Sequence, residues 1–270
     1  MPDQGTFIID MTLIYILAAT LLAALLSISL AAWMSFVMLS RLVERMVAFS
    51  VGILLGAALL HMMPEALQSH VDAHTLFALF LLSVIVFFLL ERFDVLRHSH
   101  HHEGDEHHHG HGFDVKQAGR GGLPILIGDG IHNFADGILI AAAFLADPTL
   151  GVIAAASIIA HEIPQEVGDF MVLLNAGFSK QRAYFYNLLS SLAGVAGGVT
   201  GYFVLEQSQD LVPYALVIAS ASFIYIALSD LMPQMHREGR RKEAFFQIAF
   251  MGVGLATIYS LFVALHSHAH

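Results

Sequence analysis

Apolar and polar positions divide this chain into eight long hydrophobic stretches joined by polar connections. At a rise of about 1.5 Å per residue, such stretches can cross a hydrocarbon core of ~30 Å as helices. None shows the alternating pattern of a membrane β-strand. The pattern predicts an all-α fold, a polytopic membrane bundle of eight transmembrane helices in one domain, residues 1–270. The expected spans are Met11–Leu39, Met46–Leu67, Thr75–Leu90, Gly122–Leu145, Leu150–Leu174, Ala183–Leu205, Val212–Met232 and Ala244–Leu265.

Composition agrees with a membrane protein and narrows its chemistry. The chain is 57% hydrophobic and 13% charged, whereas a soluble domain has ~25% charged residues. It contains no cysteine, which excludes disulfides and thiolate metal ligands. The lipid bilayer is therefore an expected partner, and nucleic acid is not.

The basic residues predict the orientation of the chain in the membrane. All twelve lie in the connections after the first, third, fifth and seventh stretches. Because positive charge stays on the cytoplasmic side, these four connections are expected inside and both termini outside. The expected location is a cell membrane, the bacterial inner membrane or a plasma membrane. The basic residues are Arg41, Arg45, Arg92, Arg97, Lys116, Arg120, Lys180, Arg182, Arg237, Arg240, Arg241 and Lys242.

One connection, residues 94–121, is long and rich in histidine. It has too little apolar surface to fold alone, so it is predicted to be a disordered cytoplasmic loop. Neutral imidazoles suit zinc, copper and nickel, which predicts regulatory metal capture. The alternative is a solvated linker of biased composition. The histidines are His98, His100, His101, His102, His107, His108, His109 and His111.

A short repeated pattern ends the second and seventh stretches. Residues 58–65 read Ala-Leu-Leu-His-Met-Met-Pro-Glu, and residues 227–234 read Ala-Leu-Ser-Asp-Leu-Met-Pro-Gln. The expected topology runs these two helices in opposite directions. The match predicts an inverted repeat of spans 1–3 and 6–8 around spans 4 and 5, with chance similarity as the alternative. His61, Glu65 and Asp230, within these motifs, are candidate transport-pathway residues.

Side chains that bind metals interrupt the fourth and fifth stretches. A charged side chain at the centre of a membrane helix costs at least ~2.5–3.5 kcal/mol. Helix rise places His132 and His161 roughly 15–17 Å into antiparallel helices, near the middle of the bilayer, where they are expected to meet. The fourth stretch carries Asp129, His132, Asn133 and Asp136, and the fifth carries His161, Glu162, Gln165, Glu166 and Asp169.

Helical spacing arranges these side chains in stripes. Asp129, His132 and Asp136 share one face of the fourth helix. On the fifth helix, His161 and Gln165 form one stripe, and the three acidic residues form its neighbour. Adjacent stripes predict either two metal positions or one metal with supporting side chains.

A metal ion is the favoured counter-charge for these carboxylates, because neither stretch contains Lys or Arg. Interhelical hydrogen bonds would explain one buried histidine, and a proton-only pathway is the alternative for the whole set. Imidazole, carboxylate and amide ligands suit Zn²⁺ and accept Fe²⁺, Mn²⁺ and Co²⁺. Pro164 lacks an N–H, so the carbonyl of Ala160 is free to face a cavity or an ion.

Two motifs carry a family resemblance. Residues 128–137, Gly-Asp-Gly-Ile-His-Asn-Phe-Ala-Asp-Gly, and residues 161–170, His-Glu-Ile-Pro-Gln-Glu-Val-Gly-Asp-Phe, closely resemble the LIV-1-like branch of the ZIP divalent metal transporters. The resemblance covers most of the chain. It implies Zn²⁺ uptake into the cytoplasm through a midplane site of spans 4 and 5, by a homodimer that is not an enzyme. Other cargo ions that such a site can take are Fe²⁺, Mn²⁺, Co²⁺ and Cd²⁺.

The resemblance also assigns residues. Many LIV-1 members have His in place of Gln165, and other ZIP branches have Glu in place of Asp136, so the metal preference stays open. Asp129 and Asp169 join the candidate pathway from the helical stripes rather than from the resemblance. The sixth span often adds a polar ligand, for which Asn187, Ser190 and Ser191 are candidates. The family's metal-binding places fall on His132, Asn133, Asp136, His161, Glu162 and Gln165, with Glu166 beside them.

Two other classes of function compete with a transporter. An intramembrane zinc metalloprotease would use His161 and Glu162, which begin like His-Glu-x-x-His. Gln165 stands where the second histidine belongs, however, and Pro164 interrupts the helix. A membrane-anchored metal sensor would not need so many ionisable groups inside the bilayer. Passive, proton-linked and channel-like transport stay open.

Overall fold

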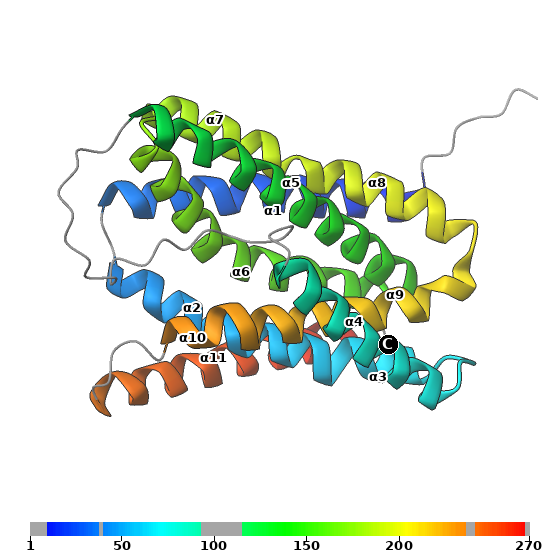
Figure 1. Cartoon of the computed structure of the whole chain (residues 1–270). Coiled ribbons are helices and arrows are strands. Elements are labelled where there is room, and N and C mark those ends of the chain that lie inside the picture. Colours follow the sequence, from blue (N-terminus) through cyan, green and yellow to red (C-terminus); the bar gives the residue numbers. More distant parts are fainter. Residues whose placement is uncertain (1–9, 38–39, 93–114, 236–240, 268–270) are drawn as a thin grey trace, which may run out of the picture.

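The computed structural model describes residues 10–37, 40–92, 115–235 and 241–267, and within these ranges no strand occurs. Long helices run back and forth along one common direction (Figure 1). Two short π-helical turns, η1 and η3, and a 3₁₀ turn, η2, are inserted between them. The elements are α1 (Met11–Val37), α2 (Ser40–Ala57), η1 (Ala58–Met62), α3 (Met63–Leu67), α4 (Ala73–Arg92), α5 (Val115–Ala146), α6 (Pro148–Asn175), α7 (Lys180–Ser191), α8 (Ala193–Glu206), η2 (Gln209–Leu211), α9 (Val212–Tyr225), η3 (Ile226–Leu231), α10 (Met232–Met235) and α11 (Arg241–Ser267).

The described helices make a polytopic membrane bundle, as predicted. Seven helical stretches in the described ranges are long and apolar enough to cross a bilayer. The eighth crossing is α6, whose polar residues His161, Glu162 and Gln165 lower its mean hydropathy. The chain is therefore a multi-pass membrane protein.

The helices pack in two groups. In one group α1 packs on α6, α5 packs on α6 and α8, and α7 continues into α8. In the other, α2 packs on α11 and α4 packs on α9. Figure 1 shows the first group above the second, with α6 facing α2 between them.

These contacts follow the expected inverted repeat. Exchange of the first three crossings with the last three turns the α1–α6 pair into α8–α5, and the α2–α11 pair into α9–α4. Both exchanged pairs are in contact. The π-helical turns η1 and η3 also stand at matching places, each directly before a Met-Pro sequence, at Met63 and Met232. The two halves of the repeat thus share a rare local backbone form as well as a sequence motif.

Close approach of α5 and α8 depends on glycine. A Cβ atom at Gly197 would lie 1.9 Å from the carbonyl oxygen of Phe134. One at Gly137 would lie 2.0 Å from the carbonyl oxygen of Gly194. Small residues let membrane helices approach until their backbones touch, and this contact positions the polar part of α5.

The helices extend beyond the spans expected from hydropathy. α2 begins at Ser40 and α5 at Val115, so residues 115–121 are helical although they were expected in the loop. Hydropathy marks the apolar part of a helix, whereas polar turns continue it into the headgroup layer. The eight histidines predicted to capture metal lie outside the described residues.

Candidate metal centre

A tight hairpin brings the two polar helices together. Only Asp147 separates α5 from α6, and its carboxylate accepts hydrogen bonds from the backbone N–H groups of Thr149 and Leu150, at 2.8 and 3.1 Å. Such a cap begins the second helix at once. His132 lies fifteen residues before Asp147 and His161 fourteen residues after it. Antiparallel helices of equal rise therefore place the two histidines at the same depth.

Four side-chain atoms converge at that depth. The Nε2 atoms of His132 and His161 are 3.4 Å apart. Asp136 Oδ2 lies 3.3 Å from His161 Nε2 and 3.7 Å from His132 Nε2. Glu162 Oε1 lies 3.4 Å from His132 Nε2 and 3.7 Å from His161 Nε2. Two imidazoles from different helices thus share two carboxylates.

These distances suit a cation with tetrahedral coordination. Ligands about 2.0–2.1 Å from a zinc ion stand about 3.3–3.4 Å from each other, and the five measured separations lie close to that value. Glu162 is 1% exposed, and neither of its carboxylate oxygens accepts a hydrogen bond in the described part of the chain. Burial of a carboxylate is costly unless a cation or a proton neutralises its charge.

A second group of carboxylates adjoins the first through Glu162. Asp129, Glu162 and Glu166 bring one oxygen each within 4.8 Å of the others, and all three are buried. Two α7 hydroxyls hold the outer members: Ser190 donates to Asp129 and Ser191 to Glu166, each at 2.5 Å. Oxygen ligands alone favour a harder cation than the two-histidine group does.

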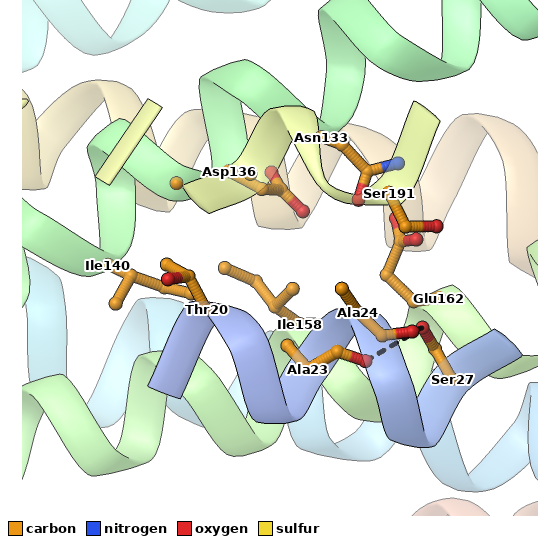
Figure 2. A pocket seen from close by; sticks show the side chains of 12 residues that line it. Thr20, Ala23, Ala24, Ser27, Asn133, Asp136, Ile140, Ile158, Glu162 and Ser191 are labelled. Atoms are coloured by element: carbon orange, nitrogen blue, oxygen red, sulfur yellow. Dashed lines mark hydrogen bonds between the residues drawn. The ribbon is translucent and has the colours of Figure 1, made fainter. Parts of the chain in front are cut away.

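A small cavity borders both groups. Its volume is about 10 Å³, roughly the space of one water-sized sphere. Figure 2 shows Thr20 and Ser27 of α1 on one side and Asp136, Glu162 and Ser191 on the other. The cavity therefore has little free space, and α1 lines it opposite the carboxylates.

The remaining residues predicted for the centre lie beside these groups. Asn133 donates its amide N–H to Asp129 Oδ1 at 2.9 Å and also lines the small cavity. Gln165 and Asp169 are both buried on α6. One oxygen of Asp169 accepts no hydrogen bond within the described residues.

The three predicted pathway residues of the repeat motifs belong to neither group. His61 is buried in η1 and stacks on Phe262, with ring centroids 4.3 Å apart. Asp230, at the matching place in η3, accepts a hydrogen bond from Gln234 at 3.2 Å. Glu65 lines a pocket of about 300 Å³ where α3 meets the start of α9.

Two details differ from the sequence expectation, and a third narrows it. The stripes grouped Asp129 with His132, whereas the structure places it with Glu162 and Glu166, because the helices cross and Glu162 reaches both groups. The carbonyl of Ala160, which was expected to be free for a cavity or an ion, accepts a hydrogen bond from Ser50 of α2. Of the three α7 candidates, Ser190 and Ser191 contact the carboxylates directly.

Comparison with known proteins gives this geometry a family context. Residues 94–261 match a family model described as ZIP Zinc transporter. Zinc transporter ZIP10 of Homo sapiens is 35% identical over 181 residues, which cover 63% of this chain and 22% of that protein. Zinc transporter foi of Drosophila melanogaster is 37% identical over 161 residues, 54% of this chain and 23% of that protein.

Metal cation symporter ZIP14 of Danio rerio is 35% identical over 147 residues, 52% of this chain and 29% of that protein. The chain thus spans less than a third of the length of these curated relatives. They belong to the LIV-1 subfamily. All three relatives come from animals. They therefore do not support the bacterial inner membrane, one of the locations expected from the sequence.

Proposed function

The chain belongs to the ZIP zinc transporter family, and from this premise we propose that it carries divalent metal ions across a membrane, with Zn²⁺ as its main cargo. The family and the matched relatives are metal transporters and not enzymes. The metalloprotease interpretation of His161 and Glu162 therefore falls away.

The convergence of His132, Asp136, His161 and Glu162 carries this proposal. Two neutral imidazoles and two carboxylates make a borderline ligand set with no net excess of negative charge once Zn²⁺ is bound. Fe²⁺, Mn²⁺, Co²⁺ and Cd²⁺ are further cargo ions in the proposal.

A second cargo position is part of the proposal. Asp129, Glu162 and Glu166 would hold it, with Glu162 shared between the two ions. Asn133 and Gln165 add amide oxygens beside the ligands. A shared carboxylate lets an ion pass from one position to the next without a step through bare hydrocarbon, which explains why both groups adjoin.

The proposed direction is uptake into the cytoplasm, through a site in the middle of the membrane, with both termini outside. The distribution of basic residues supports this orientation. His61 and Glu65 would then lie towards the outside and Asp230 towards the cytoplasm. A homodimer also belongs to the proposal, on the family resemblance alone.

Uptake of Zn²⁺ into proteoliposomes tests the site. His161→Ala and Asp136→Ala should each reduce the initial rate to less than about a tenth of wild type, since even groups that only orient a metal ligand are worth about 10- to 100-fold. His74→Ala is the matched control, because His74 is exposed at the start of α4. Wild-type rates in both site variants at equal protein content would reject the assignment.

A further inference from the structure

A serine on α2 holds the backbone that carries one of the two histidines. Ser50 is fully buried, and its hydroxyl donates a hydrogen bond of 2.5 Å to the carbonyl oxygen of Ala160 on α6. In a regular helix that carbonyl would accept from the N–H of residue 164. Residue 164 is proline and has no N–H. The hydroxyl of Ser50 therefore replaces the missing donor from a different helix.

The Ala160 carbonyl and the nitrogen of His161 belong to one peptide unit, so a bond that fixes the carbonyl also fixes the start of the histidine. The ring is held a second time, because His161 Nδ1 lies 3.0 Å from the carbonyl oxygen of Ser157. An N–H at Nδ1 that donates to Ser157 leaves the Nε2 lone pair for the four-atom group. Backbone and ring are thus anchored from two sides.

The hydroxyl of Ser50 has an alternative acceptor on its own helix. The carbonyl of Met46 lies 2.8 Å away, but a hydroxyl has only one hydrogen. Met46 does not depend on it, since its carbonyl also accepts the ordinary helical bond from the N–H of Ser50. Loss of the hydroxyl therefore affects the two carbonyls unequally. Met46 keeps its ordinary helical donor, whereas Ala160, whose usual helical donor is absent at Pro164, loses the hydrogen bond from Ser50.

We propose that Ser50 is a positioning residue for the metal centre: its hydrogen bond to Ala160 holds His161 in the place where it can bind Zn²⁺ together with His132 and Asp136. The inference rests on the proposed function of these side chains as cargo ligands. It adds a residue that lies on the other helix group, 111 positions away from the histidine in sequence. It also explains why a proline is tolerated three residues after a metal ligand.

The test is equilibrium Zn²⁺ binding by the full chain in detergent, with Ser50→Ala compared against wild type. We expect the dissociation constant to rise about tenfold, at the lower end of the effect of groups that orient metal ligands. Ser83→Ala is the matched control, because Ser83 is also buried but donates only to Leu79 of its own helix. That control should bind zinc within about twofold of wild type.

Pro164→Ala gives the decisive comparison. It restores an N–H at residue 164, which can donate to the Ala160 carbonyl within α6, so that Ser50 is no longer needed. In this background, Ser50→Ala should change the dissociation constant by less than about twofold. Ser50→Cys keeps a weak S–H donor and should weaken binding less than Ser50→Ala, which provides a milder variant if the alanine form is unstable.

The outcomes distinguish failure of the Ser50 role from failure of the proposed function. An equal loss of zinc affinity from Ser50→Ala in both backgrounds would show that Ser50 acts through packing, and would overturn the positioning role. Unchanged affinity in the single variant would overturn it as well. If the unsubstituted protein binds no Zn²⁺, the proposed function itself fails, and this inference with it.

Discussion

At the scale of single residues, Glu162 shows how far a helical stripe can be trusted. It follows His161 directly, so the helix turns it about a quarter of a circle away from that histidine. Helical spacing therefore groups Glu162 with Glu166 and Asp169 on a neighbouring face of α6. Its long side chain nevertheless returns to within 3.4 Å of His132 on the neighbouring helix. Spacing indicates which faces carry chemistry, but the reach of a flexible side chain between crossing helices decides which atoms meet.

Substitution of Gln165 should change the metal preference of the protein. Gln165→His replaces a hard amide oxygen by a borderline imidazole nitrogen, which favours Zn²⁺ over Mn²⁺. The ratio of zinc to manganese uptake in the same proteoliposomes should rise severalfold. Gln207→His is the control, because Gln207 is exposed after α8 and should leave the ratio unchanged. An unaltered ratio in the Gln165 variant would place this side chain outside the coordination of the cargo.

The two histidines could be paired from the sequence, whereas their support could not. Equal helix rise on either side of a short connection predicts that His132 and His161 approach each other. The donors that hold the site, Ser50, Ser190 and Ser191, come from helices distant in sequence. A buried serine in an apolar helix commonly bonds its own helix, as Ser83 does. Only the packing of the helices separates these two cases.

At the scale of helices, the centre depends on how closely α5 lies against α8. Gly197→Ala would place a methyl group 1.9 Å from the carbonyl oxygen of Phe134, beside Asn133. The backbone at Phe134 cannot move aside as a flexible side chain can. The clash with the added methyl group should therefore destabilise the protein by about 1–3 kcal/mol. The displacement of α5 should also weaken zinc binding.

Gly252→Ala is the matched control for that variant. Gly252 lies in α11, and a Cβ there would meet no atom within 4 Å. It should unfold at or slightly above the wild-type temperature, since alanine is a better helix former than glycine. Thermal unfolding of both variants in detergent, with zinc binding in parallel, makes the comparison. Equal behaviour of the two would show that close α5–α8 contact does not support the centre.

Hydropathy predicts where the helices lie, but it does not predict where they are interrupted. The break at Leu192 between α7 and α8 lies within one apolar stretch that was expected to be a single span. The π-helical turns at Ala58–Met62 and Ile226–Leu231 have no hydropathy signal either. The repeated Met-Pro motif marked their places without indicating their form. Both turns end directly before a Met-Pro sequence.

At the scale of the whole molecule, the ends of the described helices fall into two groups that match the distribution of Lys and Arg along the chain. The pocket of about 300 Å³ brings together residues of the connections after α3 and α8 and the last residues of α5. None of the connections at this end carries Lys or Arg. Tyr202 near the end of α8 donates a hydrogen bond of 2.9 Å to Asp10 before α1, so the start of the first helix lies at that end too. At the opposite end, Arg45 lies over the rings of Phe246 and Phe250 in α11. Within the described residues, the helix ends that lead to connections with and without Lys or Arg thus lie at opposite ends of the molecule.

Which of these ends faces the cytoplasm decides whether the transporter is an importer, and labelling can determine it. The chain has no native cysteine, so a single introduced thiol reports its own side of the membrane. Ser179 and Ser208 are exposed at opposite ends of the α7–α8 crossing. In intact cells a membrane-impermeant maleimide should label Ser208→Cys and should reach Ser179→Cys only after permeabilisation, because Lys180 and Arg182 follow Ser179 and favour the cytoplasmic side. The unsubstituted protein supplies the background. The reverse labelling pattern would invert the orientation, and with it the proposed direction of metal transport.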